Sequence, residues 1–214
     1  MQNLLLSIEN LHLSIANKTI IKDINLQINK GDFIVLLGSN GSGKSSLLKL
    51  INRIYQPTAG TIKLNNQDVN AYPKRQYAQR VLTISQITAE NLFLSMTVYE
   101  NAALYLSKVS KCELKDYLHD FNPNLSKALD LPVSVLSGGE QQALVLALCL
   151  KLQPDLLLLD EHTSGLDPQT GTHIMQLTSD FVRKYNVSCI MTTHNLQHAQ
   201  RHADRIIALD SGSL

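Results

Sequence analysis

The 214-residue sequence contains no tryptophan, and aromatic residues make up only 5% of it. Few flat rings are therefore present on which the bases of a single-stranded nucleic acid can stack. Neither sign of charge dominates, because 19 Lys and Arg residues are balanced by 18 Asp and Glu residues. Such a chain has no overall field that attracts nucleic acids or anionic lipids. We therefore expect no nucleic-acid partner.

Long hydrophobic runs are also absent. The most continuous apolar stretches, 143–150 and 156–159, are far shorter than the ~20 residues that cross a bilayer. Residues 1–6 lack the basic start and the cleavage pattern of a secretory signal peptide. The cysteines are widely spaced and form no C-x-x-C pair: Cys112, Cys149 and Cys189. These features indicate a cytosolic protein with reduced thiols.

Residues 38–45 read Gly-Ser-Asn-Gly-Ser-Gly-Lys-Ser, a complete G-x-x-x-x-G-K-S pattern. The apolar run 33–37 predicts a buried strand before it, and the spacing of 46–54 predicts a helix after it. The spacing sets four apolar residues on one face of that helix: Leu47, Leu50, Ile51 and Ile54. A plain glycine turn with an incidental lysine is the simpler alternative, but the strand and helix are the context in which this pattern binds phosphate.

The pattern predicts a site for a nucleoside triphosphate. Its glycines let backbone N–H groups curl around phosphate oxygens, and the following helix directs its positive end to the same place. Lys44 is placed to reach the β- and γ-phosphates, and the Ser45 hydroxyl to hold Mg²⁺. We expect nucleotide contacts from Gly38, Ser39, Asn40, Gly41, Ser42, Gly43, Lys44, Ser45 and Ser46.

A second chemical element is the apolar run 156–159 followed by two carboxylates, Asp160 and Glu161. The run predicts a buried strand that delivers these acids to the carboxyl edge of a sheet, where α/β sites form. Asp160 is placed to bind Mg²⁺, and Glu161 to orient or deprotonate an attacking water. A strand that ends in a solvated acidic turn is the common alternative; the phosphate loop in the same chain favours the catalytic interpretation.

The order of predicted elements indicates an α/β fold. Strands and helices alternate from 33 onward as a mostly parallel sheet requires, with further strands at 81–85, 156–160, 187–193 and 206–209. An antiparallel start precedes them, with strands at 4–8 and 24–28 and a hairpin around 61–66. Residues 87–136 instead predict short helices, one opened by a capping box from Thr97 to Glu100. We expect one domain over 1–214, with 1–86 and 137–214 as its α/β core and 87–136 as an inserted helical subdomain.

A third element is Leu-Ser-Gly-Gly-Glu-Gln-Gln at 136–142. Ser137 is a helix N-cap with Glu140 three residues on, and two glycines leave the N–H groups of the helix start open to an anion. This segment resembles the signature sequence of ABC ATPases and lies just upstream of the acidic strand, as in that family. Gln86 matches the glutamine of the family's Q-loop, 164–167 match its D-loop, and His194 matches its switch histidine. With these motifs in order, the chain is identified as similar to an ABC nucleotide-binding domain with a P-loop NTPase core.

The resemblance implies that two such domains meet head to tail, with each ATP between one phosphate loop and the partner's signature helix. The second domain is a copy of this chain or a paralogous ATPase subunit. Gln86 would then touch Mg²⁺ or the water and link hydrolysis to the helical insertion, and His194 would contact the γ-phosphate. The residues expected to serve the nucleotide from the signature helix and the D-loop are Ser137, Gly138, Gly139 and Asp167.

His194, His198 and His202 are spaced four residues apart, which raises the alternative of a metal site. The apolar positions of the same helix are expected to face the core: Leu196, Ala199, Ala203 and Ile206. That pattern leaves His198 and His202 on the opposite, solvated face. We therefore expect these two histidines to point outward.

Some positions depart from the common pattern of the family. Its adenine-stacking aromatic falls on Ile15, which offers only apolar contact. Ala143 stands where arginine is usual, and His162 stands where proline commonly follows the catalytic glutamate. The last two changes resemble a bacterial importer subfamily linked to tryptophan, tyrosine or other small organic solutes.

Two classes of function follow from the resemblance. In the first, the chain binds ATP and Mg²⁺ and hydrolyses ATP to power a membrane transporter, an importer of small solutes. Its partners are then membrane permease subunits and a substrate-binding protein, and its place is the cytoplasmic side of the bacterial inner membrane. The alternative is a soluble ABC ATPase of the cofactor-assembly type. A P-loop GTPase is a further alternative, but it would need an N-K-x-D motif. Residues 17–20 read Asn-Lys-Thr-Ile, which lacks the Asp and lies before the phosphate loop, so we reject this alternative.

Overall fold

The computed structural model describes residues 4–106 and 108–214, and these form two compact units. The sheet unit contains the described residues up to Thr83, together with Pro154–Asp160 and Asn186–Leu214. The helical unit contains the described residues of Ile84–Gln153 and Glu161–Tyr185. It thus includes residues on both sides of the expected insertion 87–136, and the domain boundaries drawn from the sequence stay a prediction.

Strands of the described residues form a four-stranded sheet in the order β2-β1-β4-β5 and a five-stranded sheet in the order β6-β7-β8-β3-β9. The strands are β1 Leu4–Ile15, β2 Lys18–Asn29, β3 Phe33–Leu37, β4 Ala59–Leu64, β5 Gln67–Asp68, β6 Val81–Ile84, β7 Leu156–Asp160, β8 Ser188–Thr193 and β9 Arg205–Ala208. The predicted antiparallel start and the predicted strands of the α/β core are therefore confirmed, and β1 and β2 are longer than expected.

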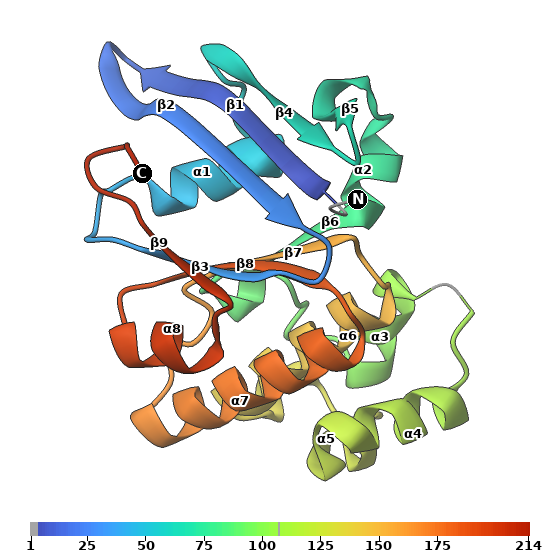
Figure 1. The fold of residues 1–214 in the computed structure, drawn as a ribbon. Helices are drawn as coiled ribbons and strands as arrows, with labels where there is room; N and C mark the ends of the chain where they lie inside the picture. The colour runs from blue at the N-terminus through green and yellow to red at the C-terminus, as the bar shows by residue number, and fades with distance from the viewer. Residues whose placement is uncertain (1–3, 107) are drawn as a thin grey trace. The chain divides into compact units, whose positions relative to one another are not determined.

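The four-stranded sheet is antiparallel, whereas β3 pairs in parallel with β8 and β9, and β7 pairs in parallel with β8. The helices of the sheet unit are α1 Lys44–Ile51, α2 Lys74–Arg80 and α8 Leu196–His202, with a 3₁₀ turn at Val69–Ala71. Helix α1 contacts both β2 and β7, so it packs between the two sheets (Figure 1). Buried aliphatic side chains from both sheets and from α1 fill this core.

Helix α1 ends earlier than its sequence spacing predicts. Arg53 takes a left-handed backbone with φ +61°, its N–H donates to the Leu50 carbonyl at 3.1 Å, and the Ile54 N–H donates to the Lys49 carbonyl at 2.8 Å. This is the Schellman arrangement that closes helix C-termini. The prediction that the helix extends through Ile54 was wrong, because the chain has left the helix before this residue, and the Ile54 side chain is 62% exposed.

The helical unit is built around α6, in which every residue from Gln142 to Leu150 is buried. Its helices are α3 Val98–Tyr105, α4 Lys111–Phe121, α5 Pro123–Lys127, α6 Gly138–Lys151 and α7 Pro168–Lys184, with 3₁₀ turns at Thr88–Glu90 and Val133–Val135. The rings of Phe121 on α4 and Phe181 on α7 stack with their centroids 3.8 Å apart. No helix among the described residues is long and apolar enough to cross a membrane.

Candidate nucleotide-binding site

The phosphate loop leaves β3 after Leu37 and enters α1 at Lys44. Gly41 and Gly43 have φ values of +82° and +107°, a backbone region that residues with a Cβ atom rarely adopt. Gly38 is required for a different reason, since a Cβ atom there would lie 2.3 Å from the Leu209 carbonyl oxygen. Backbone conformation therefore favours glycine at Gly41 and Gly43, and lack of space requires it at Gly38.

Lys44 is 5% exposed and its ammonium group lies against the loop that precedes it. Its Nζ donates to the carbonyl oxygens of Gly38 at 2.9 Å and Ser39 at 3.1 Å. A lysine ammonium is a compact point charge and a common phosphate binder. The loop thus carries a positive charge beside backbone N–H groups at the start of a helix, which together suit a polyphosphate.

The acidic strand delivers Asp160 to the same place. Asp160 Oδ1 accepts hydrogen bonds from Ser45 Oγ at 2.9 Å and from Thr192 Oγ1 at 2.8 Å. The parallel register of β7 with β8 sets Asp160 beside Thr192, and α1 supplies Ser45. The structure thereby brings together Ser45 and Asp160, which the sequence analysis expects to share a magnesium ion. It adds Thr192, which had no sequence signal of its own beyond its place near the end of a predicted strand.

The segment after β9 holds the phosphate loop from its other side. The Leu209 N–H donates to the Leu37 carbonyl at 2.7 Å, and the Gly212 N–H donates to the Ser42 carbonyl at 3.0 Å. The Gly212 carbonyl accepts from the Lys22 N–H at 2.7 Å, so this residue links the loop to β2. This contact was not predicted from the sequence, although a Ser-Gly-Ser turn after the last strand was a local signal for it.

Ile15 is the last residue of β1 and pairs with Lys18 across the hairpin turn to β2. Ala16 and Asn17 between them have φ values of +48° and +64°, as a two-residue turn with positive φ at both central positions requires. The Ile15 side chain is 44% exposed. Ile15 is therefore accessible for an apolar contact, but it has no aromatic ring on which a base could stack.

In the helical unit, Ser137 caps α6 in a complete capping box. Its hydroxyl accepts from the Glu140 N–H at 3.3 Å, and Glu140 Oε2 accepts from the Ser137 N–H at 2.9 Å. The backbone hydrogen bond from Ser137 is the main cause that lowers the pKa of Glu140. Both capping boxes predicted from the sequence are confirmed, since Thr97 and Glu100 form the same arrangement at α3.

The signature glycines and the D-loop lie side by side within this unit. A Cβ atom on Gly139 would come within 2.5 Å of Thr170 Cγ2, so the first turn of α6 packs closely against that of α7. Asp167 caps α7 and accepts from the N–H groups of Gln169 at 3.1 Å and Thr170 at 3.0 Å. Hydrogen bonds from the side chain and backbone of Thr170 lower the pKa of Asp167, which keeps its carboxylate ionised.

The remaining predicted residues lie at the ends of strands. Gln86 is exposed and follows β6, and His194 is exposed between β8 and α8. Glu161 follows β7 with a left-handed backbone, φ +48°. Beyond Gln86, Thr88 Oγ1 donates to Gln141 Oε1 at 3.0 Å, which ties this segment to the signature helix.

Three expectations for α8 were wrong. His202 is 4% exposed rather than solvated, and Leu196 and Ile206 are 52% and 41% exposed rather than buried. The helical spacing was extended through Ile206, but α8 ends at His202 and the chain is already a strand at Arg205. His198 is partly buried, and burial lowers its pKa, which keeps the ring neutral.

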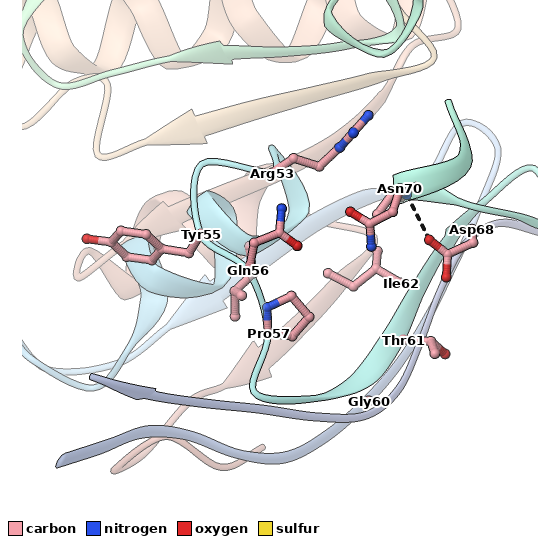
Figure 2. A pocket seen from close by; sticks show the side chains of 11 residues that line it. Arg53, Tyr55, Gln56, Pro57, Gly60, Thr61, Ile62, Asp68 and Asn70 are labelled. Atoms are coloured by element: carbon pink, nitrogen blue, oxygen red, sulfur yellow. Dashed lines mark hydrogen bonds between the residues drawn. The ribbon is translucent and has the colours of Figure 1, made fainter. Parts of the chain in front are cut away.

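A separate pocket in the sheet unit has an empty volume of about 280 Å³ and is lined by the end of α1, the start of β4 and residues 68–70 (Figure 2). Two of its polar side chains have local partners: Arg53 Nη1 donates to the Tyr72 carbonyl at 3.0 Å, and Asp68 accepts from the Asn70 N–H at 2.7 Å. None of the phosphate-loop residues lines it, and we assign it no ligand.

The parallel sheet, the glycine loop that leads into α1, and the carboxylate at the end of β7 define a P-loop nucleoside triphosphatase. The ABC transporter family model matches residues 21–164. The chain belongs to the ABC transporter family of ATP-binding proteins, whose members are ATPases.

Similar proteins agree with this assignment. The chain is 36% identical to a tyrosine transport ATP-binding protein of Clostridioides difficile (strain R20291), over 98% of this chain and 90% of that protein. It is also 36% identical to the methionine import ATP-binding protein MetN 1 of Bacillus thuringiensis subsp. konkukian (strain 97-27), over 91% of this chain. It spans only 59% of the length of that methionine import protein.

Among solved structures, the fold is similar to that of cbiO1 from Clostridium perfringens, described as part of the ABC transporter complex cbiONQ. The TM-score is 0.86 at 26% identity, over 99% of this chain and 87% of that one.

The contact between Gly212 and the phosphate loop gives a first prediction. Gly212 has φ +85°, and a Cβ atom there would lie 2.3 Å from the Ile20 carbonyl oxygen. Left-handed backbone costs a residue with a Cβ atom roughly 1–2 kcal/mol, and the clash adds to it. We expect Gly212→Ala to displace the loop and weaken ATP binding by about tenfold or more, measured by calorimetric titration.

Ser213→Ala is the matched control, because the exposed side chain of Ser213 makes no hydrogen bond in the described structure and the variant should bind like the wild type. Wild-type affinity in Gly212→Ala would show that the loop holds its form without this contact.

Proposed function

We propose that this chain is the ATP-hydrolysing subunit of a bacterial ABC importer for a small organic solute of the amino-acid class. The observation that carries the proposal is the 2.9 Å hydrogen bond between Ser45 Oγ of the phosphate loop and Asp160 Oδ1 of the acidic strand. It joins the two elements that an NTPase uses around its metal and phosphates. The relatives named for tyrosine transport and methionine import support the importer and solute class.

In the proposed site, the backbone N–H groups from Gly38 to Ser46 and the start of α1 surround the phosphates, and Lys44 contacts the β- and γ-phosphates. Lys44 now donates to two carbonyl groups of its own loop. It can exchange those for phosphate oxygens with little loss, because charge-assisted bonds are the stronger ones. Ile15 provides an apolar contact for the base.

The donor set fits a magnesium ion. Ser45 and Asp160 offer a hydroxyl and a carboxylate oxygen 2.9 Å apart, and hard oxygen ligands are those that Mg²⁺ prefers. Mg²⁺ keeps several waters and takes only one or two protein carboxylates beside the phosphates, and Gln86 is the third protein ligand that we propose. When bound, the ion neutralises charge that develops on the phosphate oxygens.

Glu161 is the proposed base for hydrolysis. It follows Asp160 directly, and its carboxylate accepts a proton from, or orients, the attacking water. His194 contacts the γ-phosphate and responds to its loss. Gln86 connects the phosphate site with the segment that Thr88 ties to the signature helix.

We further propose that two copies of this chain, or this chain and a paralogous subunit, associate head to tail. Ser137, Gly138 and Gly139 of one copy then contact the ATP held by the phosphate loop of the other. The capped start of α6 supports this role, because its open N–H groups suit an anion. Asp167 at the start of α7 lies beside this helix start and completes the contact.

The proposed permease contact lies between Gln86 and α3. Phe93 is 62% exposed while its neighbour Leu92 is 3% exposed, so one apolar side chain of this segment is directed outward. Asn101 holds the segment in place: it accepts from the Phe93 N–H at 2.8 Å and donates to the Phe93 and Thr97 carbonyls at 3.0 Å each. We propose that the exposed side chain of Phe93 contacts a permease subunit. The chain then lies on the cytoplasmic side of the bacterial inner membrane. A substrate-binding protein completes the importer.

Co-purification tests the transporter proposal against a soluble cofactor-assembly ATPase. A tagged copy expressed in its own host should recover integral membrane permease subunits from detergent extracts. Recovery only of soluble assembly proteins would contradict the transporter proposal while leaving the ATPase assignment intact.

The base assignment predicts a specific defect. Glu161→Gln should reduce the ATPase rate at least ~100-fold, the lower end of what general-base help contributes, with ATP affinity little changed. The variant should accumulate as an ATP-bound dimer, visible by size-exclusion chromatography with ATP.

Lys44→Ala is the comparison, because it should lose ATP binding and therefore dimerisation as well. Near-normal turnover in Glu161→Gln would show that another group activates the water.

Base selectivity is a further prediction. Ile15 lacks a ring, and stacking of a base on a ring is worth ~1–3 kcal/mol in nucleic-acid sites. GTP should therefore bind and be hydrolysed within about tenfold of ATP, and Ile15→Tyr should tighten ATP binding by about tenfold.

Ile15→Leu is the matched control that keeps an aliphatic contact, and it should leave the Kd for ATP unchanged. A strong native preference for ATP that Ile15→Tyr does not alter would assign base recognition to another residue.

Permease docking is tested by Phe93→Ser. Removing an exposed ring should weaken co-purification with the permease and lower transport, while the purified subunit keeps its basal ATPase rate and melting temperature. Leu104→Ser on α3 is the control, because Leu104 is 57% exposed and lies outside the proposed contact. Normal assembly of Phe93→Ser with the permease would contradict the proposed contact.

A further inference from the structure

His162 directly follows Glu161, and its ring is 3% exposed. A polar ring is costly to bury unless it is hydrogen-bonded, so its partners decide what it does. Its Nε2 lies 3.1 Å from the Oγ1 of Thr178, which is fully buried in the middle of α7. The side chain of His162 therefore anchors the chain beside Glu161 to the long helix of the helical unit.

The proton positions in this contact follow from the hydroxyl of Thr178. Thr178 Oγ1 also lies 2.7 Å from the carbonyl oxygen of Ile174, one helical turn earlier. A hydroxyl has one proton to donate, and the carbonyl oxygen can only accept, so Thr178 donates to Ile174. His162 Nε2 then carries a proton and donates it to Thr178, which fixes the orientation of the imidazole ring.

The anchor acts where the backbone is strained. Glu161 has φ +48°, and its carbonyl accepts from the Ser164 N–H at 2.9 Å, which closes a turn with His162 at its second position. Proline is favoured at that position because its ring sets φ in advance. Histidine does not restrict φ in this way. A strained backbone persists only where its surroundings hold it, and the bond to α7 supplies that restraint here.

We propose that His162, held by Thr178, is a positioning residue that fixes the carboxylate of Glu161 for hydrolysis. The proposal rests on the proposed role of Glu161 as the base. Loss of the hydrogen bond would let the turn relax and move the carboxylate, while the phosphate loop in the sheet unit keeps its own contacts. Loss of this hydrogen bond should therefore lower the turnover of ATP without changing ATP binding.

Thr178→Val is the decisive variant, because it keeps the side-chain volume and removes only the hydroxyl. We expect kcat for ATP hydrolysis to fall at least about tenfold, since a misplacement of ~1 Å in a catalytic group costs up to about 100-fold. The Kd for ATP should change less than twofold. Thr178→Ser restores the hydroxyl and should return kcat to within about twofold of the wild type.

A matched control lies on the same helix. Thr172 Oγ1 donates to the carbonyl of Pro168, four residues earlier, at 2.8 Å. Thr178 makes the same kind of bond to Ile174, but the side chain of Thr172 is exposed. Thr172→Val therefore removes an equivalent backbone contact without touching His162, and its kcat should match the wild type.

A double-variant cycle separates positioning from general destabilisation. His162→Pro restores a residue that sets φ by itself, and adding Thr178→Val to it should cause no further fall in kcat. Melting temperatures of all variants show whether each is folded at the assay temperature. Wild-type kcat in Thr178→Val, equal losses of kcat and ATP affinity, or a full effect of Thr178→Val in the His162→Pro background would each overturn the proposal.

The proposed base is tested separately by Glu161→Gln. If Glu161→Gln is inactive while Thr178→Val turns over normally, only the positioning proposal is wrong. If Glu161→Gln keeps near-normal turnover, the base assignment is wrong and the positioning proposal falls with it.

Discussion

Backbone N–H groups can surround a phosphate only where the chain turns too tightly for side chains, and this constraint organises the sheet unit. Gly41 and Gly43 meet it with positive φ, and Gly38 meets it by close approach to Leu209. The buried carbonyl groups of such a turn need hydrogen-bond partners. Lys44 satisfies two of them, at Gly38 and Ser39, and the Gly212 N–H satisfies that of Ser42. The loop is thus held by the charge that binds phosphate and by a segment more than 160 residues away in sequence.

The parallel register of the strands extends this arrangement to the proposed metal ligands. Because Leu37 pairs with Thr193 and Asp160 with Thr192, the ends of β3, β7 and β8 lie at one edge. Asp160 accepts two hydroxyl hydrogen bonds there, from Ser45 and from Thr192. A hydroxyl and a carboxylate oxygen thus meet at this edge, and such hard oxygen ligands are those that Mg²⁺ prefers.

Much of this could be predicted from the sequence, because the decisive signals are local. The phosphate loop, the apolar run that ends in Asp160 and the two capping boxes each consist of residues within a few positions of one another. The confirmed strands and helices follow from the same local patterns. The pairing of Ser45 with Asp160 was also expected, since parallel strands bring their carboxyl ends together.

What could not be predicted depends on contacts that the local pattern does not contain. Thr192 and Gly212 become important only once β8 and the segment after β9 are set beside the loop. The wrong faces assigned to His202 and Leu196 came from extending a helical period past the end of α8. Periodicity indicates which residues of a helix share a face, but it does not fix the last residue of the helix. That residue depends on where the next strand begins to pair in the sheet.

The departures from the family pattern fall where side chains, rather than backbone groups, make the contact. The phosphate loop matches the pattern in full, because the geometry of phosphate and glycine leaves no alternative. Ile15 and His162 instead occupy positions where one side-chain interaction can replace another: an apolar contact for a stacked ring, and a hydrogen bond to Thr178 for a proline ring. In the function proposed above, binding of the triphosphate depends on groups that are fixed, whereas contact with the base and placement of Glu161 depend on side chains that can vary. Variation between members of such a family can therefore adjust base choice and turnover while the phosphates stay in place.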